Sequence, residues 1–265
     1  FISLVSICNV VMLTIGAFIP WISLAIISIL LFAILLILKV RIFWEREIFN
    51  PLFLLIILLA VLLRASPNLY LTGGQDPGSY VSLSKQYEIN KSLYIEDELR
   101  NSFSEDIKRI YDKGNVFTGL KTHNKEASEY IIPFYPVFPS WMSIFGSILG
   151  SDNRIFALTM FSVLSIISVY LFSYEISGRN KKIALLSSFL LAINPLHLYF
   201  SRVPTTEIVS MFFLFFSLYV LVRFFNETKI NKYRPIYLVL SIISSLALFY
   251  TRMSAIFILP IILLI

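Results

Sequence analysis

The chain has 265 residues, of which 57% are hydrophobic and only 14% charged, whereas a soluble domain has about 25% charged residues. Its net charge of +6 comes from basic residues that flank apolar runs, so the charge reflects membrane topology and argues against nucleic-acid binding. The single cysteine, Cys8, cannot form an internal disulfide and therefore gives no indication of the redox compartment.

Long windows without charge predict membrane-spanning helices, because a spanning helix needs about 20 apolar residues. Pro20 and Trp21 separate the first two windows, which together are too long for one helix in a bilayer. The chain begins at Phe1 and stops at Ile265 inside an apolar run, so we expect the N-terminal part of a longer protein without its C-terminal remainder. The predicted spans are 2–19, 21–39, 51–66, 154–176, 182–200, 206–225, 235–250 and 253–265.

The short loops between these spans indicate an orientation. Loops 39–50, 177–182 and 223–235 carry ten basic residues, whereas the short loops on the other side hold only Arg202 and Arg252. The positive-inside rule places the ten basic residues in the cytoplasm. The fold class predicted is therefore all-α, a polytopic transmembrane helix bundle whose long segment between the third and fourth spans is extracytoplasmic.

That extracytoplasmic segment, residues 67–152, is too long and too polar to be a simple turn. Short helices are predicted at 77–90, 104–113 and 137–149. The first begins at Asp76-Pro77, an N-cap followed by a proline at the first helical position. The third is apolar but too short to span, so we expect it at the outer interface, with Tyr135 and Trp141 as interfacial anchors.

The conspicuous polar residues of the predicted spans lie at their outer ends. His197, Arg202 and Glu207 lie where the fifth span ends and the sixth begins, and Arg252 lies in the turn after the seventh. The middles of the spans carry no ionisable residue, which argues against an ion pump or a proton-coupled transporter. It favours chemistry at the outer interface, where an arginine can hold a lipid phosphate and a carboxylate can remove a proton from a hydroxyl.

Several segments resemble one family of membrane enzymes. Gly73-Gly-Gln-Asp-Pro-Gly-Ser-Tyr80 resembles the first outer-loop motif of the GT-C glycosyltransferases, which include protein O-mannosyltransferases and lipid A aminoarabinose transferases (glycosyltransferase family 39-like). Phe134-Tyr-Pro-Val-Phe-Pro139 is similar to their juxtamembrane segment. The segments 191–202 with Thr206-Glu207, and 246–252, resemble two later span exits. The resemblance runs from about residue 51 to the end of the chain.

The resemblance implies a GT-C-like fold that moves a sugar, with inversion, from a polyprenyl-phosphate donor to a lipid, glycan or protein acceptor. Asp76 would be the general base, and Arg202 and Arg252 would bind the donor phosphate. Many members carry two adjacent acidic residues where this chain has Asp76-Pro77, so Glu207 is a possible second carboxylate, and the use of a divalent metal stays open. Lys85, His123 and Tyr80 are candidates for substrate contact.

Other interpretations remain. The protein could be a flippase or transporter of lipid-linked glycans, or a non-catalytic membrane scaffold whose outer loop binds a partner. Asp76 could serve only as a helix cap, Arg202 and Arg252 could snorkel to lipid head groups, and Glu207 could cap its helix or pair with Arg202. His197 is expected to be a satisfied polar residue. We expect a multi-pass protein of a prokaryotic plasma membrane, with the site on the extracytoplasmic face and no nucleic-acid partner.

Overall fold

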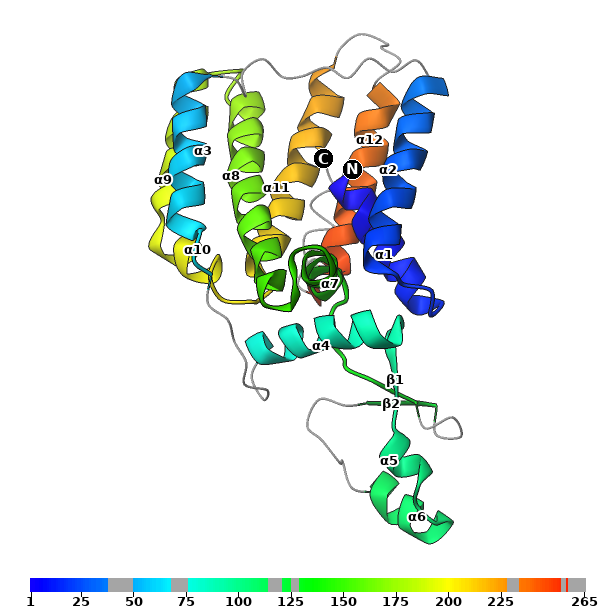
Figure 1. Ribbon diagram of the computed structural model, residues 1–265. Coiled ribbons are helices and arrows are strands. Elements are labelled where there is room, and N and C mark those ends of the chain that lie inside the picture. The colour runs from blue at the N-terminus through cyan, green and yellow to red at the C-terminus, as the bar shows by residue number, and fades with distance from the viewer. Residues whose placement is uncertain are drawn as a thin grey trace.

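The computed structural model describes residues 1–37, 50–67, 76–113, 121–124, 129–227, 234–253 and 256. Apolar helices that lie roughly parallel form the body of a bundle (Figure 1). They are α2 (Pro20–Ile37), α3 (Pro51–Arg64), α8 (Phe156–Ile176), α9 (Lys181–Ile193), α11 (Glu207–Asn226) and α12 (Arg234–Phe249). A shorter helix, α1 (Ile2–Thr14), packs against α12 and α2.

Helices occupy the first seven apolar windows of the sequence, whereas most of the window 253–265 and of the loop 39–50 lies outside the described residues. Within the described part, two stretches are long and apolar enough to cross a membrane: Ser151–Ile176, formed by the 3-10 turn η2 (Ser151–Ile155) and α8, and the helix α11. The other apolar helices of the described part fall short of this criterion. The prediction of eight spans therefore stays a prediction.

The fifth predicted span is not one helix. Residues 182–200 contain α9 (Lys181–Ile193) and a separate short helix, α10 (Pro195–Phe200). Pro195 has no backbone N–H and cannot continue α9, while the side chain of Asn194 accepts a hydrogen bond from the His197 N–H at 3.0 Å and caps the new helix. A single continuous helix was the wrong prediction here.

Two further helices lie across one end of the bundle, α7 (Val137–Leu149) and, beyond it, α4 (Asp76–Asn90) (Figure 1). Both lie where short helices were predicted. Trp141 of α7 is not an interfacial anchor, because it is only 3% exposed and its indole N–H donates to Ser6 Oγ at 2.8 Å. It belongs to the main hydrophobic core, in edge-to-face contact with Phe161 of α8.

Helix α4 is fixed to the bundle by an ion pair. Arg154 of η2, 1% exposed, donates from Nη1 to Glu88 Oε1 at 3.0 Å and to Ser84 Oγ at 2.7 Å. Burial raises the pKa of Glu88, and the Arg154 charge opposes that rise. A Cβ at Gly146 of α7 would lie 2.6 Å from Glu88 Oε1, so a larger residue there would force this carboxylate to shift.

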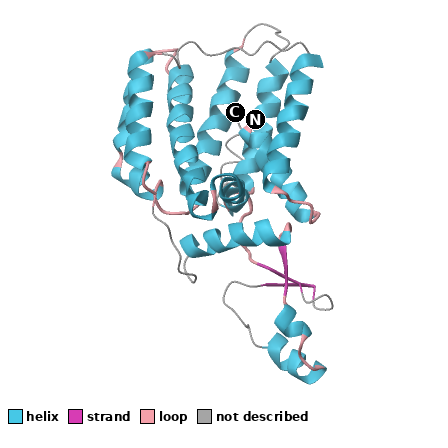
Figure 2. Cartoon of the chain, viewed as in Figure 1, coloured by secondary structure: helices cyan, strands magenta, loops and turns pink. Residues whose placement is uncertain are grey.

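Beyond α4, the chain forms a small lobule of helices and strands (Figure 2), and the sequence predicted only part of this secondary structure. It contains α5 (Glu98–Asn101) and α6 (Glu105–Lys113), and the latter was predicted. It also contains an unpredicted antiparallel sheet of β1 (Tyr94–Glu96), β3 (Glu129–Ile131) and β2 (Lys121–Asn124), in the order β1-β3-β2. Each strand has three or four residues, which is too short for a clear alternation of apolar and polar positions.

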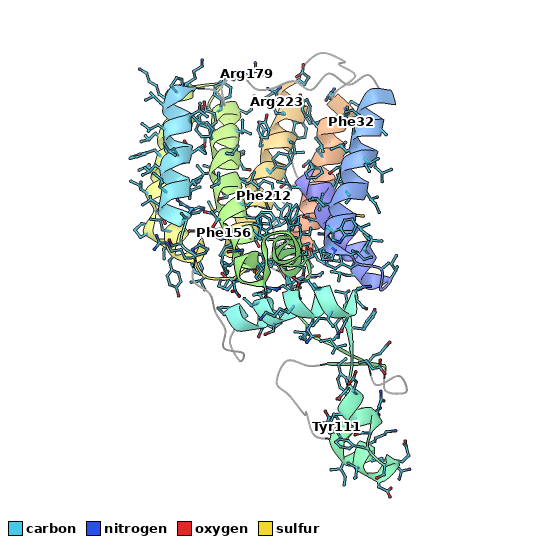
Figure 3. The ribbon with its side chains drawn as sticks, viewed as in Figure 1. Phe32, Tyr111, Phe156, Arg179, Phe212 and Arg223 are labelled. Atoms are coloured by element: carbon cyan, nitrogen blue, oxygen red, sulfur yellow. The ribbon has the colours of Figure 1, made fainter. Side chains whose placement is uncertain are left out.

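The opposite end of the bundle holds a second buried charge cluster. Figure 3 places Arg179 and Arg223 there, far from Tyr111 of the lobule. Glu175, 3% exposed, accepts from Arg223 Nη1 at 2.7 Å, and Arg179 Nε lies 3.6 Å from its other carboxylate oxygen. Arg179 and Arg223, which come from two of the basic segments of the sequence, therefore lie at the bundle end away from α4.

Candidate active site

A cavity of about 320 Å³ lies at the end of the bundle that α4 covers. Four segments far apart in the sequence form its walls: the first turn of α4, the strand-to-helix segment before α7, the start of α11 and the residues after α12. Its lining residues are Asp76, Tyr80, Pro133, Phe134, Tyr135, Thr205, Thr206, Glu207, Arg252 and Met253.

Asp76 is the first residue of α4, and its side chain is exposed. The proline that follows has a fixed φ and needs no N–H at this position, so the sequence starts a helix here and places the carboxylate at its N-terminal end. A negative charge is favourable there because the helix N-terminus carries partial positive charge. The carboxylate is thus held at the cavity by its helix and remains open to a substrate.

Across the cavity, Glu207 and Arg252 form an ion pair. Arg252 Nη1 donates to Glu207 Oε1 at 2.7 Å, with the two side chains 43% and 34% exposed. The other carboxylate oxygen, Oε2, is buried and has no hydrogen-bond partner within the described part of the chain. Sequence analysis suggested Arg202 as the partner of Glu207, but the structure pairs it with Arg252.

Tyr80 forms the wall between the two carboxylates. Its ring is 6% exposed and lies edge-on to Phe134, with 4.9 Å between the ring centroids. Burial raises the pKa of Tyr80 to about 12. The hydrogen bond with Thr206 lowers this pKa, whereas the negative charges of Asp76 and Glu207 raise it further. The phenol therefore stays protonated at physiological pH.

Arg202 does not reach this cavity. Its Nη2 donates to the backbone oxygen of Leu63, at the end of α3, at 2.6 Å. It lines a different pocket of about 380 Å³, which is described below. The structure thus brings together Asp76, Tyr80, Glu207 and Arg252 but separates Arg202 from them, so the expectation that both arginines line one cavity is not met.

Of the two other candidates for substrate contact, the structure describes the side chain of Lys85 alone. Lys85 lies on α4 with an exposed side chain, and it is not among the lining residues. His123 lies in β2, and its side chain is outside the described residues.

Sequence analysis gave no role to Arg64, the last residue of α3, which is fully buried. Its Nη2 donates to His197 Nδ1 at 2.7 Å, and His197 Nε2 lies 2.8 Å from Ser165 Oγ. Because a guanidinium can only donate, His197 accepts at Nδ1 and donates from Nε2, which makes it the satisfied polar residue that we expected. The sequence feature that could have indicated Arg64 is its position as a single cation at the end of an apolar run.

No group of three or more His, Cys, Asp or Glu side chains that could hold a metal ion occurs among the described residues. Within the cavity, the carboxylates are those of Asp76 and Glu207, and one oxygen of Glu207 is already engaged by Arg252. These side chains can accept a proton, hold a hydroxyl group and place one positive charge beside an anion.

Comparison with known proteins gives one match. Residues 134–265 match the family model described as Dolichyl-phosphate-mannose-protein mannosyltransferase. No match was found among curated proteins or among solved structures. The matched segment begins at Phe134 of the cavity wall and includes Glu207 and Arg252, whereas Asp76 and Tyr80 precede it.

Proposed function

Residues 134–265 belong to the dolichyl-phosphate-mannose-protein mannosyltransferase family, and on that premise we propose that this chain transfers a sugar at the outer face of a membrane with Asp76 as the general base. The family is one of GT-C-type membrane glycosyltransferases that use lipid-linked sugar donors. The donor in this proposal is a polyprenyl-phosphate sugar, and the acceptor carries a hydroxyl or a similar nucleophile.

The proposed reaction is a single displacement at the anomeric carbon. Asp76 takes the proton of the acceptor as the acceptor oxygen forms a bond to that carbon. The bond from the anomeric carbon to the phosphate oxygen breaks, and the polyprenyl phosphate leaves with the electron pair. Attack from the face opposite to the leaving group inverts the configuration of the sugar.

The leaving phosphate gains negative charge as this bond breaks, so a fixed positive charge nearby lowers the barrier. Arg252 is the cavity residue that supplies this charge, and Glu207 Oε1 orients its guanidinium through the 2.7 Å contact. A planar guanidinium also matches the spacing of phosphate oxygens.

The observation that supports this proposal most directly is the shared cavity of Asp76 and Arg252, which are 176 positions apart in the sequence. Its volume of about 320 Å³ is at the lower end of the range of about 300–1,000 Å³ that small-molecule sites occupy. This size suits a single sugar ring better than a long oligosaccharide. The rings of Tyr80, Phe134 and Tyr135 supply apolar walls against which a sugar face can pack.

Replacing Asp76 with Asn tests the base. Asn is a good helix N-terminal residue, so α4 should form normally while the proton acceptor is lost. We expect transfer from polyprenyl-phosphate-mannose in isolated membranes to fall by about 10²–10⁴-fold, the usual contribution of general acid–base catalysis. Asp106→Asn is the matched control, because Asp106 is an exposed carboxylate on α6, outside the cavity.

The two variants should be present in the membrane at equal levels, as measured by immunoblot. Near-normal transfer by Asp76→Asn would remove Asp76 from the chemistry. Equal loss in Asp76→Asn and Asp106→Asn would show that the defect lies in the outer lobule as a whole.

A further inference from the structure

A second pocket, of about 380 Å³, lies beside α10 and does not include the residues of the candidate active site. We call it the α10 pocket. It is lined by Pro195, Leu198, Tyr199, Arg202 and Val203. Arg202 is exposed and Tyr199 is 58% exposed, so the pocket opens at the surface of the bundle.

Two guanidinium groups give this corner of the bundle a positive charge. Arg202 is bound to the Leu63 carbonyl, and the next residue in the chain is the buried Arg64. The acceptors of Arg64 are all neutral. They are Ser162 Oγ at 2.6 Å, His197 Nδ1 at 2.7 Å, Ala192 O at 3.0 Å and Ala60 O at 3.1 Å.

No carboxylate in the described part of the chain forms an ion pair with Arg64 or Arg202. The sequence that follows Arg64, residues 65–75, contains no Asp or Glu. Buried charges in proteins are generally paired, because an unpaired charge is costly to remove from water. An anion supplied by a ligand at Arg202 would offset the charge that this corner carries.

The remaining walls of the α10 pocket indicate what kind of anion fits. Pro195, Leu198 and Val203 are apolar, and Tyr199 offers an aromatic ring with a polar tip. Among the described residues that line the pocket there is neither a carboxylate nor a histidine, which suits binding without reaction. A ligand with an anionic head beside an apolar chain matches both parts of this lining.

We propose that the α10 pocket binds an anionic phospholipid of the surrounding bilayer. The guanidinium of Arg202 holds the head-group phosphate, and Leu198 and Tyr199 pack against the start of an acyl chain. Tyr199 belongs to α10, which lies at one end of the bundle (Figure 1), and tyrosines at this level typically meet lipid head groups. The lipid is a resident ligand and not a substrate, because Asp76 and Arg252 line the other cavity. This proposal does not depend on the proposed function, since it involves no sugar transfer.

Lipid retention measured by native mass spectrometry tests the proposal on the full chain in detergent, titrated with phosphatidylglycerol. Arg202→Gln removes the charge but keeps an amide donor for the Leu63 carbonyl, so the end of α3 stays capped. We expect its affinity for one bound phosphatidylglycerol to fall about tenfold or more, as expected for a lost charge-assisted contact. Arg109→Gln, at an exposed position of α6 that lines neither pocket, is the matched control and should retain that lipid.

Wild-type retention by Arg202→Gln would overturn the proposal, as would an equal loss in Arg109→Gln. Displacement of the lipid by excess inorganic phosphate would show a plain anion site and would also overturn it. Should Arg202→Gln fold poorly, Tyr199→Glu gives an independent test, because this exposed position tolerates charge and a carboxylate there repels a phosphate. It should lose the same lipid, and normal retention would contradict the proposal.

Discussion

Among single residues, Arg252 offers the sharpest test of the candidate site. Its guanidinium is held at the cavity by Glu207, and we assign it to the donor phosphate. Arg252→Ala should lower kcat/KM for a polyprenyl-phosphate sugar by about 10- to 100-fold, since a charged hydrogen bond contributes about 1.5–3 kcal/mol. Arg252→Lys should recover part of this loss, because it keeps the charge but not the two-pronged geometry.

The matched control is Arg109→Ala, which removes an exposed arginine from α6. Initial rates over a range of donor concentrations, in detergent-solubilised protein, give the measurement. An Arg252→Ala enzyme with the wild-type kcat/KM would exclude a phosphate contact and leave Arg252 as a structural partner of Glu207.

The sequence predicted which charged residues lie near the site, but it did not predict which of them form ion pairs. Charges at span ends were placed on one face by the positive-inside rule, and Asp76, Glu207 and Arg252 do line one cavity. The same rule put Arg202 with them, because topology fixes depth in the membrane and not position around the bundle. The α9–α10 break carries Arg202 to the end of α3 instead.

Among the helices, the contact between α4 and α7 is a second test. Gly146→Ala would place a methyl group 2.6 Å from Glu88 Oε1, so Glu88 must move and Arg154 loses its carboxylate. We expect the free energy of unfolding to fall by about 1–2 kcal/mol. The buried charge of Arg154 loses its partner, and alanine offsets about 1 kcal/mol of that cost because it favours the helix more than glycine does. Thermal unfolding in detergent measures this as a lower midpoint.

A double-mutant cycle separates this cause from other effects of the methyl group. In a Glu88→Ala background the clash with the carboxylate is absent, so Gly146→Ala should cost little. Ser147→Ala, on the exposed side of the same helix, is the control and should leave the midpoint nearly unchanged. A full additive loss in the Glu88→Ala background would contradict the proposed cause.

Apolar windows were good predictors of helices, because a helix that is apolar over most of its surface has a strong sequence signal. Local chemistry within the windows was harder to predict. Asn194-Pro195 ends α9 and caps α10. The residues on both sides of this pair are apolar, so the hydropathy of the window predicted one continuous helix. The lobule also depends on tertiary contacts such as the Arg100–Asp112 ion pair at 2.8 Å between α5 and α6, which no local pattern predicts.

For the whole molecule, the orientation in the membrane is a prediction from the charge pattern, with the α4 end of the bundle on the outer side. The lobule with α6 and the loop between α8 and α9 lie at opposite ends of the bundle (Figure 1), and the charge pattern places the first outside and the second in the cytoplasm. Asp106 of α6 and Lys181 at the start of α9 are both exposed. Each is therefore suited to a single introduced cysteine in a chain whose own Cys8 is replaced by serine.

In intact cells, a membrane-impermeant maleimide should label Asp106→Cys and not Lys181→Cys. Permeabilised cells should label both, because each position is open to solvent once the membrane barrier is removed. The positive-inside rule disfavours the reversed orientation, because that orientation would place the ten basic loop residues on the outer side. Labelling of Lys181→Cys alone in intact cells would reverse the topology and place Asp76 on the cytoplasmic side, where the proposed outer-face reaction cannot occur.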